Sequence, residues 1–312
     1  MISDSKQMST ESAAAADIMV CCASCGIAEV DDIKLKMCNG GCDLMKYCSD
    51  ECQNNNKEQH EESCRKRAAE LRDKELLTQP DSSHLGDCPI CFLPLPIDER
   101  KSTMMPCCSK LICDGCNYAN QKREFEAGLE QRCAFCREPL VKTEEEERKR
   151  WKKRVKKNDP VAMYVMGRMR HLEGDYDTAI KYWTRAAELG DAMAHYVLSV
   201  AYYDGKGVEQ NKEKFIYHSE QAAIAGHPEA RHNIGIEEWN NDRFDRAKKH
   251  FIIAANLGCH ESLRQVMELC ADGHASKEDY ANALRAYQVA VDAMASKERG
   301  EAEKVLAIWK SE

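Results

Sequence analysis

Cysteine is the residue type that sets this sequence apart. Eighteen of its 312 residues are cysteine, and sixteen of these lie between Cys21 and Cys136. Most come in pairs with two or three residues between the partners, and His60 precedes Cys64 by four positions. Thiolate and imidazole groups at such spacings are the usual ligands of tetrahedral structural zinc sites.

A disulfide framework is the alternative for clustered cysteines, and it requires a secretory route. Residues 1–20 lack the basic start and the hydrophobic core of a signal peptide, and Ala13 to Ala16 form their most apolar stretch. We expect a disordered tail there. In a reducing compartment paired cysteines are more often metal ligands, so the spacings favour zinc.

The first cluster occupies residues 21–66 and offers seven cysteines and one histidine, enough for two tetrahedral sites. Cys21 is a spare thiol that could replace Cys22 in a shifted register, but Cys22 forms the standard Cys-x-x-Cys with Cys25. The sequence Tyr-Cys-Ser-x-x-Cys-Gln and the later His-x-x-x-Cys resemble the MYND zinc finger. That resemblance implies two interleaved sites, one of Cys22, Cys25, Cys48 and Cys52, the other of Cys38, Cys42, His60 and Cys64.

Two positions depart from the MYND pattern. Cys38 and Cys42 have three residues between them, one more than usual, and Lys57 stands where the family commonly has tryptophan. In the family that tryptophan helps to form a groove for proline-containing peptides. Peptide binding of that kind is therefore not expected here.

The second cluster occupies residues 87–140 and contains eight cysteines in four pairs. It resembles the RING finger, in a form with cysteine at the usual histidine position. An alternative register makes Cys108 the third ligand and places Lys110 at the histidine position, but lysine is a poor zinc ligand at neutral pH. The resemblance implies one site of Cys88, Cys91, Cys113 and Cys116 and another of Cys107, Cys108, Cys133 and Cys136.

RING domains often act as ubiquitin ligases, which catalyse by positioning a charged conjugating enzyme. The resemblance implies that Ile90, inside the first pair, contacts that enzyme and that Arg137, just after the last ligand, bridges enzyme and ubiquitin. Two family features are missing, because Ala134 replaces a proline and Asn120 replaces a large apolar residue. The alternative is that the cysteines only hold a fold and Arg137 is a solvated surface residue.

From residue 159 the sequence becomes helical and periodic. The segment starting at Ala162 recurs at Ala194, Ala230 and, weakly, Ser262, which are 32, 36 and 32 residues apart. A second signature, an alanine pair followed by Gly190, Gly226 or Gly258, keeps the same phase. Such a period predicts a stacked solenoid of helix pairs, with glycine at left-handed helix ends.

This pattern resembles the Sel1-like repeat, a relative of the tetratricopeptide repeat, over about residues 159–295. The best match runs from Ala201 to Val208 and continues through Gly226 to Ala230. Such repeats are scaffolds and adaptors for protein complexes. Single repeat residues are expected to be core or turn, so only the concave surface as a whole is a functional candidate.

Two charged segments connect these regions. Residues 67–86 are expected to form a linker. Residues 141–158 hold an acidic block, Glu144 to Glu147, and then eight lysines or arginines within residues 148–157. Acidic residues near the start of a helix and basic residues near its end stabilise it through the helix dipole, so we expect a helix here that caps the solenoid. A nuclear import signal or a nucleic-acid contact is the alternative, but the formal net charge of −8 argues against general nucleic-acid binding.

The expected architecture is a tail (1–20), a MYND-type finger (21–66), a linker (67–86), a RING-like finger (87–140), a charged helix (141–158) and an all-α Sel1-like solenoid (159–312). Every zinc set is complete with four protein ligands, so four structural zinc ions are expected and no hydrolytic site. No apolar run suits a membrane span. We expect a cytoplasmic or nuclear protein whose partners are a ubiquitin-conjugating enzyme, substrates or complex subunits. A non-enzymatic adaptor is the alternative to a ligase, and a nuclear transcriptional cofactor is a third reading.

Overall fold

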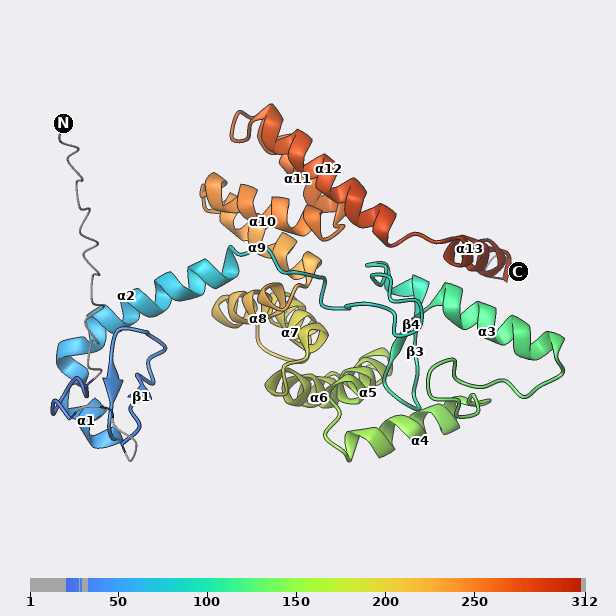
Figure 1. The fold of residues 1–312 in the computed structure, drawn as a ribbon, viewed down its shortest axis with the longest axis horizontal. Coiled ribbons are helices and arrows are strands. Elements are labelled where there is room, and N and C mark those ends of the chain that lie inside the picture. The colour runs from blue at the N-terminus through green and yellow to red at the C-terminus, as the bar shows by residue number, and fades with distance from the viewer. Residues whose placement is uncertain (1–20, 28, 30–32, 310–312) are drawn as a thin grey trace, which may run out of the picture. The chain divides into compact units, whose positions relative to one another are not determined.

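The computed structural model describes residues 21–27, 29 and 33–309 (Figure 1). The tail expected over residues 1–20 lies outside this part of the chain. The chain divides into two compact units, Met1–Glu75 and Leu76–Glu312. Each is described separately.

The first unit is small and built around cysteine. Strands β1 (Lys36–Met37) and β2 (Lys46–Tyr47) pair antiparallel, with Lys36 opposite Tyr47. Helix α1 (Asp50–Asn55) follows, and its N-cap Ser49 accepts a hydrogen bond from the Cys52 amide at 3.2 Å. The buried cluster consists of Cys22, Leu35, Cys38, Cys42, Tyr47 and Cys64. Such a core is too small to fold without a further source of stability.

Helix α2 (Lys57–Leu76) extends into the segment expected to be a linker, so residues 67–76 are helical. The run is rich in strong helix formers, and Arg67 pairs with Glu70 one turn further on at 3.2 Å. Arg67 also donates two hydrogen bonds to Asp43, at 2.6 and 2.8 Å, which tie the helix to the loop after β1.

The RING-like segment (residues 87–140) opens the second unit. The 3₁₀ turn η1 (Glu99–Lys101) leads into β3 (Ser102–Met104), which pairs antiparallel with β4 (Leu111–Cys113). Helix α3 (Asp114–Glu126) follows directly. The buried residues are Cys88, Leu95, Met105, Ile112, Cys113 and Cys133.

The charged segment forms α4 (Glu144–Val155). Thr143 caps its N-terminus by accepting from the Glu146 amide at 3.2 Å. Trp151 is 1% exposed and packs against Ala162 and Met166 of α5. The helix therefore caps the first repeat, as the charge pattern predicts.

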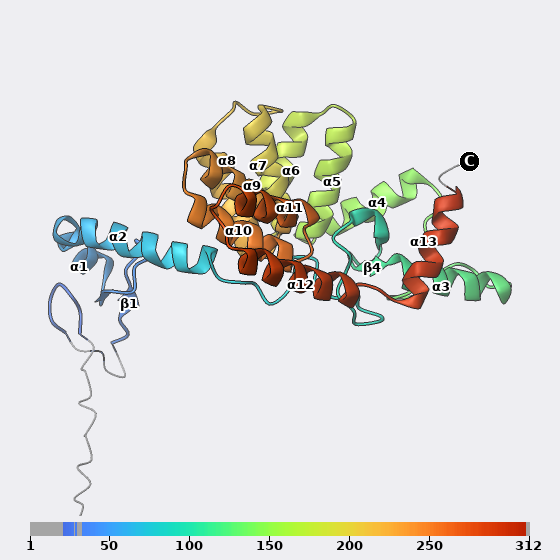
Figure 2. The same cartoon turned by 90° about the horizontal axis from the view of Figure 1, so that it is seen from above.

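Eight helices stack in antiparallel pairs to form the solenoid (Figure 2). Their bounds are α5 (Pro160–Leu172), α6 (Tyr176–Glu188), α7 (Ala192–Asp204), α8 (Lys212–Ile224), α9 (Pro228–Asn240), α10 (Phe244–Asn256), α11 (His260–Ala271) and α12 (Lys277–Ala293). The glycines after α6, α8 and α10 have φ values of 85°, 87° and 98°, as expected for left-handed helix ends.

Small residues set the distance between paired helices. A Cβ on Gly235 would lie 2.5 Å from the ring of Phe251, and one on Gly167 would overlap the indole of Trp183. Phe251 and Trp183 are themselves buried. The alanine and glycine positions of the repeat thus let large aromatic residues of the neighbouring helix fill the core.

The last helix, α13 (Lys297–Trp309), departs from the expected solenoid over residues 159–312. It packs against α3 of the RING-like segment, whereas α12 packs against α10 and α11. Helical periodicity alone does not distinguish a stacked repeat from a helix that docks elsewhere. Among the helices that the structure describes, none is long and apolar enough to cross a membrane.

Candidate metal centres

Four groups of four side chains each bring their donor atoms within 4.8 Å of one another. They are numbered here in chain order as the first to fourth donor groups. Zinc–sulfur bonds of about 2.3 Å in a tetrahedron place sulfur atoms roughly 3.8 Å apart. Each group could hold one zinc ion.

The first donor group consists of Cys22, Cys25, Cys48 and Cys52. The Sγ atom of Cys48 lies 3.5 Å from that of Cys25 and 3.6 Å from that of Cys52. Cys48 follows β2, and Cys52 lies in the first turn of α1, so the Ser49 cap positions both. Cys21 is exposed and outside the group.

The second donor group consists of Cys38, Cys42, His60 and Cys64, all of them buried. His60 and Cys64 lie one turn apart on α2, with Cys64 Sγ 3.5 Å from Cys38 Sγ. The His60 Nε2 atom faces Cys42 Sγ at 3.1 Å. It is therefore the ring nitrogen that would bind the metal.

Glycine accommodates the extra residue between Cys38 and Cys42. Gly41 has a φ of 77°, a conformation that side chains disfavour, and a Cβ on Gly40 would overlap the sulfur of Cys64. The Gly40 amide instead donates to Cys38 Sγ at 3.4 Å. The departure from the MYND spacing thus leaves a compact donor group.

The third donor group consists of Cys88, Cys91, Cys113 and Cys116. Cys113 is the N-cap of α3, and its Sγ lies 3.8 Å from that of Cys91. The hydrogen bond with the Cys113 side chain, together with backbone amides, lowers the pKa of Cys88 to about 4 against the effect of burial. The same contact raises the pKa of Cys113, and burial raises that of Cys116. Zinc, which binds thiolates, would therefore have to displace protons from these partners.

The fourth donor group consists of Cys107, Cys108, Cys133 and Cys136. Cys136 Sγ lies 3.3 Å from Cys107 Sγ, and Cys108 Sγ lies 3.9 Å from Cys133 Sγ. Lys110 is not a member; its ammonium lies 6.0 Å from the centroid of the Phe135 ring. The geometry corresponds to the register in which the adjacent cysteines are both ligands.

Arg137 is held inside the RING-like segment. Its guanidinium donates to Glu124 Oε1 at 2.5 Å and to Asn120 Oδ1 at 2.8 Å, although its side chain is 46% exposed. Burial raises the pKa of Glu124, but hydrogen bonds from the Arg132 amide and Arg137 outweigh it and hold that pKa below its usual value. Ile90 and Ala134 are half-buried in the same segment.

Glu124 is a functional candidate that sequence reasoning missed. It is 1% exposed, and its Oε2 atom accepts a hydrogen bond from the side-chain amide of Asn120 at 3.1 Å. A glutamate in a charged, solvent-facing helical sequence carries no signal of burial. Its role, to hold the Arg137 guanidinium, becomes visible only in the contact between the two side chains.

Residues 76–86 lie along the solenoid. The buried Arg231 on α9 donates to the carbonyls of Leu76 and Ala223. The His84 ring stacks on that of His227 with centroids 4.1 Å apart, and the His84 amide donates to the Gly226 carbonyl at 3.1 Å. This segment therefore covers turns that join successive repeats, which the linker composition did not predict.

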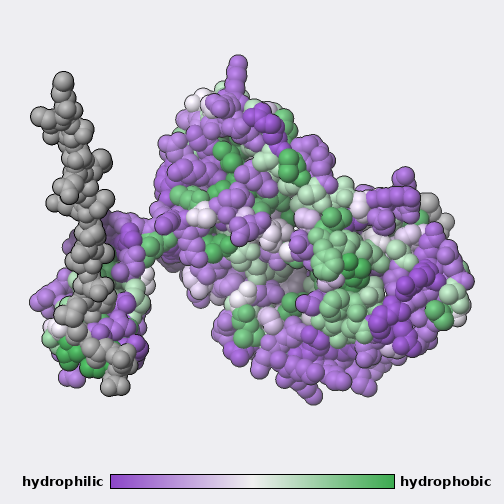
Figure 3. Space-filling model, in the orientation of Figure 1, coloured by the Kyte–Doolittle hydropathy of each residue, from purple (hydrophilic) through white to green (hydrophobic). Residues whose placement is uncertain are grey.

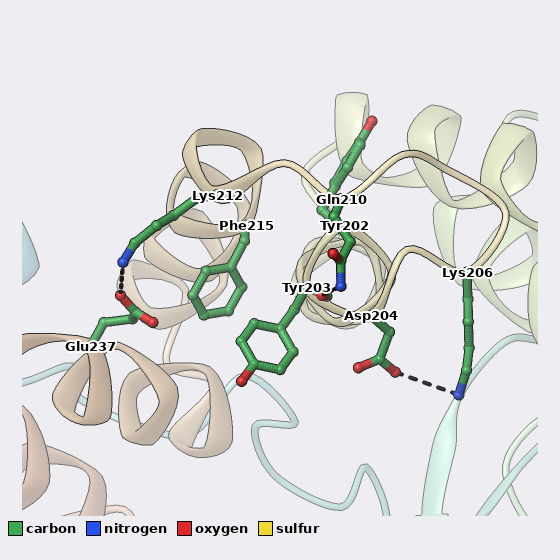
Figure 4. Close-up of a pocket in the computed structure, with 8 residues that line it drawn as sticks. All are labelled: Tyr202, Tyr203, Asp204, Lys206, Gln210, Lys212, Phe215 and Glu237. Atoms are coloured by element: carbon green, nitrogen blue, oxygen red, sulfur yellow. Dashed lines mark hydrogen bonds and ion pairs between the residues drawn. The ribbon is translucent and has the colours of Figure 1, made fainter. Parts of the chain in front are cut away.

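A hollow of about 680 Å³ lies beside the turn between α7 and α8 (Figure 4). The rings of Tyr203 and Phe215 face it with centroids 5.3 Å apart. Ion pairs flank it, Lys206 with Asp204 at 3.5 Å and Lys212 with Glu237 at 2.8 Å. Its charges are thus paired within the solenoid.

Comparison with known proteins identifies the repeats. The Sel1 repeat model matches residues 160–191, 192–227 and 235–259. A Sel1 repeat protein from Oxalobacter formigenes is similar, with 26% identity and a TM-score of 0.43 over 49% of this chain and 66% of that one. The uropathogenic Escherichia coli antigen c5321 shares 18% identity with a TM-score of 0.39, over 53% of this chain and 37% of its own. The C-terminal part of the chain is a solenoid of Sel1 repeats.

Proposed function

We propose that the protein is a zinc-dependent protein-interaction scaffold. The observation that carries this is the combination of four complete donor groups with a Sel1-repeat solenoid in one chain. When bound, zinc would supply the folding energy that the small cysteine-rich cores lack. The third and fourth groups belong to the same unit as the solenoid, so they can present a zinc module at a defined place on it.

Zinc stoichiometry tests the first half of the proposal. Native mass spectrometry of the full chain should show four zinc ions, and each of Cys52→Ser, Cys64→Ser, Cys91→Ser and Cys136→Ser should lose one. Cys270→Ser is the matched control, because Cys270 lies on α11 outside every donor group. Four ions in any of the ligand variants would contradict the assignment of that ligand.

Ubiquitin ligase activity is the finer proposal for the RING-like segment. The interleaved third and fourth donor groups support it, with α3 beginning directly after Cys113 and carrying Cys116. The exposure of Arg137 supports it as well, and Ile90 is half-buried. In such a ligase the MYND-like finger and the solenoid would recruit substrate. The bonds of Arg137 to Glu124 and Asn120 support the alternative, an adaptor without catalytic activity, because they occupy donors that a bridging arginine needs.

An assay of ubiquitin-chain formation with a panel of conjugating enzymes distinguishes the ligase from the adaptor. A ligase should form ubiquitin chains that vanish in Ile90→Ala and Arg137→Ala while four zinc ions remain bound. Arg132→Ala is the matched control, since Arg132 is an exposed arginine of the same segment. Zinc-loaded wild type that forms no chains would establish the adaptor. Either activity suits a cytoplasmic or nuclear location, which a fluorescent fusion would reveal.

A further inference from the structure

Arg299, near the start of α13, reaches the third donor group. Its guanidinium donates to Cys91 Sγ at 3.5 Å and to the carbonyl of Leu93 at 3.2 Å. It also donates to the carbonyls of Pro94 at 2.6 Å and Met294 at 2.5 Å. One side chain thus joins the C-terminal helix, the end of α12 and the loop that carries a ligand cysteine.

The charge at this site favours a cation. Four thiolates and one Zn²⁺ carry a net charge of about −2 in a partly buried environment. Among the described residues, the Arg299 guanidinium forms no ion pair with a carboxylate, and the side-chain atom that accepts from it is the Cys91 sulfur. An N–H···S bond from a charged donor would stabilise the bound, anionic form of the group.

The fourth donor group provides a contrast within the same segment. Arg154 of α4 approaches it, but donates to the Cys107 carbonyl at 3.1 Å and not to a sulfur atom. Its charge is also paired with Asp159 at 2.5 Å. The two zinc groups therefore differ in whether an arginine acts on a ligand.

Gly115 allows this approach. A Cβ on Gly115 would lie 2.7 Å from the Arg299 amide nitrogen and 2.9 Å from its Cγ. Gly115 lies between the ligands Cys113 and Cys116 at the start of α3. Any side chain there would push α13 away from the third donor group. Ile97, Met294 and Arg299 line one cleft beside this contact. Figure 3 shows that apolar patches interrupt the hydrophilic surface on the face drawn.

We propose that Arg299 is a positioning residue for zinc at the third donor group, and that zinc binding there is coupled to the docking of α13 on α3. The coupling is reciprocal. The free energy by which bound zinc stabilises the docking of α13 equals the free energy by which docking stabilises bound zinc. Partners of a metal ligand alter affinity by about 10- to 100-fold. The inference rests on the proposed zinc content.

The test follows zinc loss at each group separately. Full-length zinc-loaded protein is mixed with a zinc chelator and N-ethylmaleimide, and labelled cysteines are quantified by peptide mass spectrometry over time. Arg299→Gln should speed labelling of Cys88, Cys91, Cys113 and Cys116 about 10- to 100-fold. Labelling of the fourth group should stay within about twofold of wild type, and Arg299→Lys, which keeps the charge, should recover part of the protection.

Two further variants separate the charge from general loosening. Gly115→Ala should speed labelling at the third group with Arg299 intact, because it displaces α13. Arg285→Gln, an exposed arginine on α12, should leave both groups unchanged. In wild type, zinc removal should raise amide hydrogen exchange in α13 more than in α12, a measurement that needs no variant.

The outcomes distinguish this inference from the proposed function. If wild type binds four zinc ions but Arg299→Gln is labelled at the same rate as wild type, the inference is wrong. The proposed scaffold function would then still stand. Equal acceleration at the third and fourth groups would also overturn it, since that indicates loosening of the whole segment. Fewer than four zinc ions in wild type would overturn the zinc content and the inference together.

Discussion

The RING-like segment and the Sel1-repeat solenoid lie in the same unit but bury different kinds of residue. Half of the buried cluster of the RING-like segment is ligand cysteine, namely Cys88, Cys113 and Cys133. The solenoid buries alanine and large apolar residues such as Trp183 and Phe251. If the donor groups bind zinc as proposed, the first core gains stability from metal binding, whereas the second gains it from removal of apolar surface from water. The two regions should therefore respond to different perturbations.

Zinc removal should have the largest effect and should separate the two regions. Structural zinc contributes on the order of 10 kcal/mol or more to folding of a small domain. A chelator should raise amide hydrogen exchange through residues 33–66 and 87–140, while helices α6 to α10 stay protected. Loss of protection in α6 to α10 at the same chelator concentration would show that the solenoid depends on zinc as well.

Removal of a buried ring should act on the solenoid instead. Phe251 is fully buried against Gly235, and Phe251→Ala should lower the free energy of unfolding by about 3–5 kcal/mol. Urea unfolding of the zinc-loaded protein, followed by helical circular dichroism, measures this. Phe125→Ala is the control, because Phe125 is 78% exposed and should change little. Both variants should keep four zinc ions.

The contact between residues 76–86 and the solenoid should have an intermediate effect. Arg231→Met keeps much of the buried volume but removes the donors to the Leu76 and Ala223 carbonyls. Unpaired buried groups cost about 1–3 kcal/mol each. Faster amide exchange at His84 is expected, with the third and fourth donor groups unaffected. Unchanged exchange there would mean that the His84–His227 stack alone holds the segment.

Acid should weaken the zinc modules but strengthen one helix cap of the solenoid. Protonation of thiolates releases zinc and weakens the zinc modules. In the solenoid, burial raises the pKa of Asp191, the N-cap of α7, to about 6. Its carboxylate is thus disfavoured in the folded state, so this group adds stability as pH falls from about 6 toward its unfolded value near 4.

Asp191→Asn tests that direction. Asparagine keeps an acceptor for the Ala194 amide and removes the buried charge. The variant should be about 1–2 kcal/mol more stable than wild type at pH 7.5, with the difference shrinking toward pH 5. Urea unfolding at both pH values measures it. If the variant is less stable than wild type at pH 7.5, the hydrogen bonds of the charged cap stabilise the folded state by more than burial of the carboxylate destabilises it.

Much of this architecture was predictable from the sequence. Ligand pairs a few residues apart, such as His60 and Cys64 on one helix face, follow from local geometry. The repeat period predicts helix pairs, and Gly190, Gly226 and Gly258 predict where the second helices end. The helix over residues 67–76 was missed because its charged composition also suits a linker, although its residues are strong helix formers.

The sequence by itself predicted the candidate donor groups, the repeat and the helix ends, because these depend on neighbours within one turn or on a regular period. Only the tertiary structure decided that α13 docks on α3, that Glu124 holds Arg137, that Arg231 holds residues 76–86 and that Arg299 reaches Cys91. Most of these contacts join residues far apart in the chain. The three contacts of Arg137, Arg231 and Arg299 also depend on the direction of one side chain toward a carboxylate, a carbonyl or a sulfur atom, which a periodic sequence pattern does not predict.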